Sequence, residues 1–248
     1  MPVQIAVRPS RQIGMRSRRS VDRPDGGVDR RAPDARDPDE WRVVASSRRA
    51  GGFSYIAEVE SRNAERIRLR AERDKLKAID PEGLADAWAM IEGLWRGTVA
   101  RAGKLPEPDV RERVNGEWSF VQTQRHLVLA TDCWLRRMVK GMEHPYHPWG
   151  LGGSWLTSPR RWGLNPDADP SFDQVLKLRR RRMSEVREVV ACATAKELER
   201  ICIPPESPGH PRQDHTVLQC LHVILKEEWQ HHRYAVRDLH VLEQRPRG

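Results

Sequence analysis

Cysteine is scarce in this chain, and its few cysteines lie far apart. The four residues are Cys133, Cys192, Cys202 and Cys220, and no two of them form a Cys-x-x-Cys pair. This spacing argues against both a cysteine zinc site and a disulfide framework. We therefore expect small, buried cysteines in a protein of the reducing cytoplasm.

Long apolar runs are also absent. No stretch approaches the roughly 18 consecutive apolar residues that a membrane span needs, so no membrane association is expected. The N-terminal arginines lead into aspartate, proline and glycine, which argues against a secretory signal. With 248 residues, 32% of them charged, and a mean hydropathy of -0.74, the chain is typical of one water-soluble domain with extensions.

Much of the net charge of +9 lies near the N-terminus, where residues 1–50 hold 12 arginines against 7 acids. Residues 1–38 are dominated by Pro, Gly, Asp and Arg, and too little apolar surface is available there to offset the entropy of ordering the chain. We expect a disordered basic tail. The alternative is an arm for nucleic acid or an anionic surface, but the segment lacks the interleaved aromatic residues that bind single strands, so nucleic acid is not an expected partner.

Helical periodicity dominates the rest of the chain. Residues 39–80 are predicted to form a charged helical extension, with a helix over 55–79 whose apolar residues are sparse. Four longer helices are predicted near 81–103, 117–140, 171–191 and 216–242, with a short helix after Thr194. Trp88, Trp95 and Trp134 lie on the main apolar stripes of their helices, so we expect all three in the core.

Residues 141–170 interrupt this pattern with Gly, Pro, Trp and His and no sustained period. Loops of this length are uncommon unless they are functional or disordered, and the tryptophans favour an ordered one. His144 and His147 in this loop would line a substrate entrance, act as ligands, or simply pack beside Trp149. The prediction is an all-α, four-helix bundle over residues 81–243 with a long crossover between its second and third helices, so its order is not simply up-down-up-down.

The last predicted helix contains the sharpest signal. Its apolar stripe, at spacings of three and four residues, consists of Leu218, Leu221, Leu225, Glu228, His232, Ala235, Leu239 and Leu242. A buried carboxylate needs a partner, and side chains at i and i+4 project from one helix face, so Glu228 and His232 could bind one metal ion. The alternative is that they bond each other or an arginine such as Arg179.

The neighbouring pair Glu227 and His231 has the same spacing. It lies about 100° around the helix from the stripe and is expected to be less buried. The stripe therefore favours Glu228 and His232. A third ligand should come from another helix, and the candidate is His126, which lies in a strongly apolar helix.

Two segments together resemble the DinB-like (DinB/YfiT-type) metalloprotein superfamily, near its mycothiol-dependent maleylpyruvate isomerase branch. They are Glu117-Trp-Ser-Phe-Val-Gln-Thr-Gln-Arg-His-Leu-Val and Glu227-Glu-Trp-Gln-His-His-Arg-Tyr-Ala-Val-Arg-Asp-Leu. The resemblance covers about residues 82–242. The chain departs from it at Glu228, where many members have histidine, and at Tyr234-Ala235, where many have Gly-Gln.

The resemblance implies an up-down-down-up bundle that binds a divalent ion through a histidine of the second helix and a pair on the last helix. Carried over to this chain, the ligands are His126, Glu228 and His232. Zinc is the expected ion, with nickel or another divalent metal as alternatives. Two nitrogens and one carboxylate would leave open positions on such an ion, as in catalytic sites.

The implied activity is that of a metal-dependent thiol S-transferase or isomerase, which joins a low-molecular-weight thiol to a small electrophile. Family thiols include mycothiol, bacillithiol and glutathione. The 37 arginines against 7 lysines suggest a GC-rich genome and hence mycothiol. The alternative is a non-catalytic, metal-stabilised bundle that serves as a binding or stress-related interaction protein. A homodimer is compatible with either function.

Overall fold

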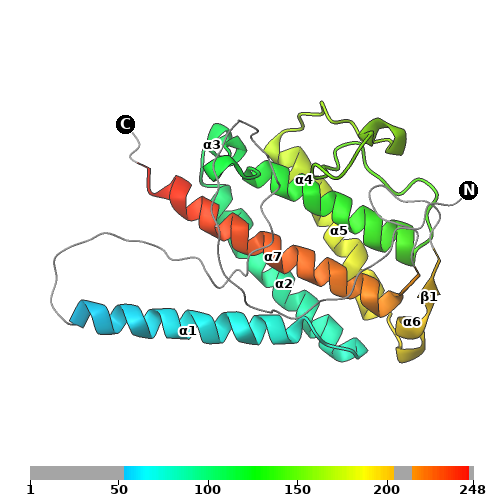
Figure 1. Ribbon diagram of the computed structural model, residues 1–248, viewed down its shortest axis with the longest axis horizontal. Coiled ribbons are helices and arrows are strands. Elements are labelled where there is room, and N and C mark those ends of the chain that lie inside the picture. Colours follow the sequence, from blue (N-terminus) through cyan, green and yellow to red (C-terminus); the bar gives the residue numbers. More distant parts are fainter. Residues whose placement is uncertain (1–52, 204–213, 246–248) are drawn as a thin grey trace, which may run out of the picture. The chain divides into compact units, whose positions relative to one another are not determined.

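The computed structural model describes residues 53–203 and 214–245, and the regular structure in these ranges is almost entirely helical (Figure 1). The all-α prediction is confirmed. The predicted disordered tail, residues 1–38, lies outside the described residues. The α-helices are α1 (Phe53–Lys75), α2 (Pro81–Ala102), α3 (Glu107–Arg111), α4 (Phe120–Thr131), α5 (Phe172–Ala191), α6 (Ala195–Glu199) and α7 (Val217–Glu243).

Shorter elements connect these helices. Residues 53–203 and 214–245 contain two 3-10 turns and one antiparallel pair of two-residue strands, and a π-helix follows α4 directly. These elements are η2 (Val114–Gly116), η3 (the π-helix, Asp132–Val139), η4 (Pro159–Trp162), β1 (Ile201–Cys202) and β2 (His215–Thr216). No described helix is both long and apolar enough to cross a membrane.

The helices begin where side-chain caps are available. Asp80 accepts a hydrogen bond from the backbone N–H of Gly83 at 2.9 Å, and Ser171 and Thr216 form capping boxes at α5 and α7. A further capping box at Ser119 makes α4 begin slightly later than the sequence pattern predicted. Each cap satisfies backbone donors that the first helical turn leaves without a partner.

Two buried side-chain contacts show that α5 runs parallel to α4 and the π-helix η3 that continues it. Arg179 donates to Gln124 at 3.2 Å, and Arg182 donates to Asp132 at 2.6 Å. Residue numbers therefore increase together along both helices. The long connection between them must return the chain to the end where α4 began.

The other helices run in the opposite direction. On α7, Glu227 contacts His126 of α4 at 3.4 Å, whereas Arg237, ten residues later, contacts Glu117 just before α4 at 2.7 Å. Helix α2 is parallel to α7: Thr98 contacts His232, and Arg101, later in α2, contacts Glu243, later in α7. The bundle formed by α2, α4, α5 and α7 is therefore up-down-down-up.

The core lies between these four helices. Trp88 and Trp95 of α2 are each 2% exposed, as the stripe predicted. Trp134 is only partly buried and packs at the edge of the core, with its ring 5.2 Å from that of His215. The difference arises because residues 132–139 adopt a π-helix, whose wider turn rotates them relative to an α-helical stripe.

The crossover over residues 140–171 is held against α4. The Leu151 N–H donates to the carbonyl of Arg125 at 3.3 Å, and the Arg125 Nε donates to the carbonyl of Trp149 at 2.9 Å. Gly150 makes this close approach feasible, since a Cβ there would lie only 3.3 Å from the Leu129 Cβ of α4. The loop consequently lies over the segment of α4 that contains His126.

Replacing Trp88 with alanine should lower the free energy of unfolding by about 3–5 kcal/mol, because the indole is fully buried in the core and its removal leaves a cavity. Urea denaturation followed by circular dichroism measures the change. The matched control is Ile67→Ala on α1, where the side chain is 70% exposed and the cost should stay within about 0.5 kcal/mol. Equal losses in the two variants would contradict the assigned core.

Candidate metal centre

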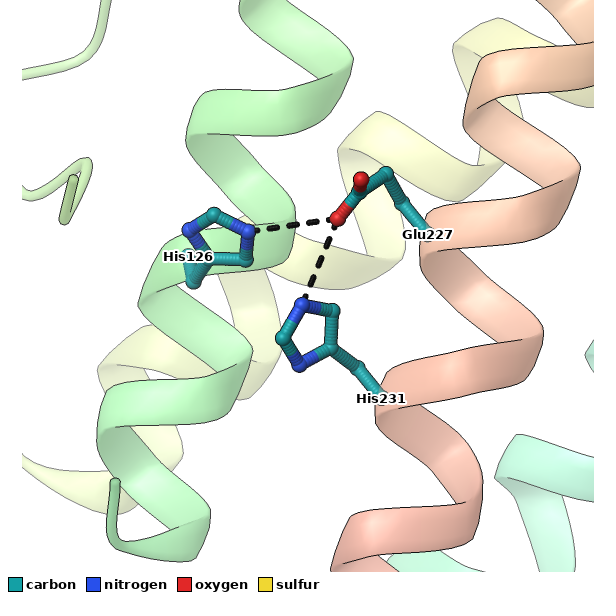
Figure 2. Close-up of side chains that lie close together, drawn as sticks. All are labelled: His126, Glu227 and His231. Carbon is teal, nitrogen blue, oxygen red and sulfur yellow. Dashed lines mark hydrogen bonds and ion pairs between the residues drawn. The ribbon is translucent and has the colours of Figure 1, made fainter. Parts of the chain in front are cut away.

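Helices α4 and α7 bring one carboxylate and two imidazoles together (Figure 2). Glu227 Oε2 lies 3.4 Å from His126 Nε2 and 3.3 Å from His231 Nε2. One ligand atom from each of the three side chains lies within 4.8 Å of the other two. Among the described residues, one group of three or more His, Cys, Asp or Glu side chains lies close enough together to hold a metal ion, and it is this one.

These separations suit a divalent ion. Two ligands at about 2.0–2.2 Å from a tetrahedral zinc ion lie about 3.3–3.6 Å apart. The two nitrogen-to-oxygen distances of 3.4 and 3.3 Å fall in this range. Two of the three ligand-to-ligand separations therefore match those around one ion, and the third lies within 4.8 Å.

The protonation states also suit metal binding. Burial disfavours the charged form of Glu227, but hydrogen bonds to His126 and His231 outweigh it and hold the pKa of Glu227 well below its usual range. Burial also lowers the pKa of His231, although its bond to Glu227 opposes the shift. A carboxylate that is ionised and a His231 ring that is neutral are the forms that bind metal.

His126 is oriented by the crossover. Its Nδ1 lies 3.0 Å from the carbonyl oxygen of Leu151, which can only accept a hydrogen bond. With Nδ1 bonded to this carbonyl, Nε2 is the ring nitrogen that faces Glu227 and would coordinate a metal ion. A backbone carbonyl of this kind commonly orients a metal-ligating histidine.

The site lies at the edge of the bundle rather than in its core. The side chains of His126, Glu227 and His231 are 12%, 32% and 17% exposed. Trp118 covers one side, with its ring centroid 4.6 Å from that of His126 and stacked 6.0 Å from that of His231. The three side chains are therefore partly in contact with solvent, unlike those of the core.

Glu228, the predicted carboxylate ligand, points elsewhere. Both of its oxygens accept hydrogen bonds from Arg179 Nη2, at 2.9 and 2.7 Å. Burial raises the pKa of Glu228, and the charge of Arg179 opposes the rise. The structure therefore shows the alternative considered for Glu228, a bond to the arginine Arg179 of a neighbouring helix.

His232, the predicted imidazole ligand, is also engaged elsewhere. Its Nε2 lies 2.8 Å from Thr98 Oγ1, and the ring also bonds to the backbone of Leu94. Both partners belong to α2, so His232 is held within the core. The geometry thus brings Glu227 and His231, each one residue earlier than the predicted Glu228 and His232, together with His126.

The sequence does contain the i, i+4 spacing of Glu227 and His231, but its apolar stripe favoured the neighbouring pair Glu228 and His232. We expected ligands on the apolar stripe of α7, whereas the observed cluster lies on the flank that faces α4, about 100° away. A partly solvated flank allows a carboxylate to remain ionised without an arginine partner. Identifying this flank requires the position of α4 relative to α7, which the pattern of α7 alone does not contain.

The crossover histidines lie outside the cluster. His144 is exposed, and the ring of His147 packs 4.8 Å from that of Trp149 while its Nδ1 accepts from the Trp149 N–H. Burial lowers the pKa of His147. Of the roles considered for His147, packing beside Trp149 is the one observed.

Two histidines and a glutamate at one interface of the four-helix bundle form a group of side chains that could hold a metal ion. The DinB superfamily model matches residues 90–235, well over half of the chain. The protein therefore belongs to the DinB superfamily. No curated protein and no solved structure matches the chain.

The pKa of His232 is lowered to about 4, chiefly by burial, so the folded protein resists protonation there. Between its ordinary value of 6.5 and about 4, the unfolded chain binds the proton more readily, and stability should fall as the pH falls. As the pH falls through this window, the free energy of unfolding of the His232→Gln variant should decrease by about 2–3 kcal/mol less than that of the wild type. Denaturant titrations at several pH values with a chelator present measure the difference, and identical slopes would contradict it.

Gly150→Val should displace the crossover from α4, because its new side chain would meet Leu164, the His147 carbonyl and Leu129. The Leu151 carbonyl would then no longer orient His126, and divalent-metal affinity should fall about 10–100-fold. Calorimetric titration with Zn²⁺ measures the change. Gly97→Ala is the control, since a Cβ there meets nothing within 4 Å, and equal affinities in the two variants would refute the role of the loop.

Proposed function

We propose that this protein is a divalent-metal-dependent S-transferase or isomerase that uses a low-molecular-weight thiol. The observation that carries the proposal is the convergence of His126, Glu227 and His231 at a solvent-accessible helix interface. Two nitrogens and one oxygen are the donor set of catalytic zinc-type sites, in which at least one coordination position stays open. A closed structural site would require a fourth protein ligand.

The residues around the site have separable tasks. Ionised Glu227 would supply the negative charge, and His126 and His231 would each supply a ring nitrogen. Trp118 shields one side of the two imidazoles from water. When bound, a zinc-like ion would lower the pKa of a coordinated thiol, so that its sulfur is a nucleophile at neutral pH.

The nucleophilic sulfur is proposed to come from outside the chain. Cys133 lies on the helical segment that follows His126, but burial raises the pKa of its thiol to about 12. Burial likewise raises the pKa of the Cys220 thiol to about 12. Thiols of this kind stay protonated at neutral pH and are poor nucleophiles, which favours a free thiol cofactor.

We propose mycothiol as this cofactor and a small electrophile as the second substrate. Two considerations support mycothiol: the resemblance to the mycothiol-dependent isomerase branch and the strong preference for arginine over lysine in the sequence. The competing function is a metal-stabilised bundle without catalytic activity. The two functions differ in whether a thiol reaches the metal.

Protein purified without chelators or a metal-affinity column should contain about one divalent ion per chain, measured by elemental analysis. The variants His126→Ala, Glu227→Gln and His231→Ala should each lower zinc affinity by at least about a hundredfold, because each removes one of three ligands. His232→Ala is the matched control on the same helix and should retain the ion. Loss of metal in His232→Ala with retention in His231→Ala would reverse the assignment.

A second measurement separates catalysis from stabilisation. Addition of mycothiol to the Co²⁺-substituted protein should produce a sulfur-to-cobalt charge-transfer absorption band in the wild type, because an open position accepts the thiolate. Thiol consumption with a model electrophile should then depend on the metal. Metal binding without a thiol band and without turnover would favour the non-catalytic bundle.

A further inference from the structure

Arg179 of α5 joins α4 and α7 inside the bundle. Its Nε donates to Gln124 Oε1 at 3.2 Å, and its Nη2 donates to both oxygens of Glu228 at 2.9 and 2.7 Å. Gln124, Arg179 and Glu228 are 1%, 2% and 1% exposed. We call this group of three residues the Arg179 clamp.

The clamp lies at the level of the candidate metal centre. Gln124 is two residues before His126 on α4, and Glu228 is adjacent to Glu227 on α7. The two helices that supply the metal ligands are therefore the two that Arg179 connects. The clamp lies on the inner side of these helices, and the ligands lie on the partly exposed side.

The geometry of the guanidinium suits a spacer. Its planar fork makes directed bonds to two partners at once and loses little freedom for each bond formed. Functional metal sites require their ligands to be held within about 0.5 Å of the productive geometry. The contacts between α4 and α7 at the site include the bond from His126 to Glu227 and the ring contact of His126 with His231.

We propose that Arg179 is a positioning residue that sets the spacing of α4 and α7 at the metal ligands. This inference rests on the proposed metal site at His126, Glu227 and His231. It differs from a purely stabilising role, in which the ion pair would contribute to folding but not to ligand geometry. Arg179 itself does not contact the metal.

The test compares two variants with a control. Arg179→Met leaves Glu228 buried without its partner, whereas the double variant Arg179→Met/Glu228→Met removes both charges and should regain much of the lost stability. Val186→Ala is the control, because it removes buried volume from α5 without touching the clamp. Each protein is titrated with Co²⁺ at a temperature at which all are folded.

We expect both Arg179 variants to bind Co²⁺ at least tenfold more weakly than the wild type and to give altered visible d–d spectra. Val186→Ala should match the wild type in affinity and spectrum. The decisive result is the double variant, in which stability should recover while affinity stays low. Recovery of wild-type affinity and spectrum together with stability would overturn the positioning role.

A metal-free measurement separates this inference from the proposed function. The rings of His126 and His231 have centroids 4.6 Å apart, so a nuclear Overhauser contact between them is expected in the chelated wild type and in Val186→Ala. It should be lost in the double variant. If the wild type binds no Co²⁺, the proposed function fails while this contact still tests the clamp, and its persistence in the double variant would refute the clamp.

Discussion

A carboxylate lies in the centre of this bundle, and the arginine bonded to it makes that burial tolerable. Glu228 lies on the apolar stripe of α7, where an unpaired charge would cost several kcal/mol. Arg179 compensates by bonding both of its oxygens. With Glu228 accommodated in this way, the apolar stripe of α7 faces the core, and the neighbouring Glu227 lies on the flank that faces α4. The location of the candidate metal centre depends on that orientation.

Helix α7 contains two overlapping Glu-x-x-x-His pairs with opposite environments. In the inner pair, Glu228 and His232 have their polar atoms occupied by other residues of the core. In the outer pair, Glu227 and His231 have each other and His126 as neighbours and remain partly exposed. A displacement of one residue along a helix thus separates side chains that maintain the fold from side chains that are available for chemistry.

The fold was more predictable from the sequence than the site. Apolar stripes and capping residues such as Ser171 and Thr216 are local signals, and the helices that they predicted are present. His126 was identified because it interrupts an apolar helix, and it lies in the cluster. The choice between Glu227 and Glu228 depended on the position of Arg179, about fifty residues away, and no pattern within α7 encodes that position. The π-helix after α4 was likewise not anticipated.

The parallel course of α4 and α5 has an evolutionary consequence. The chain must travel back along a helix of 20 residues, roughly 30 Å, which about ten extended residues could span. The crossover over residues 140–171 is far longer than this minimum, and it contacts the site through Leu151. Insertions, deletions and substitutions in the surplus length can reshape the approach to the ligands while the bundle stays intact. The surroundings of the candidate metal centre are therefore modular, since they are built in part by a segment that can diverge independently of the scaffold.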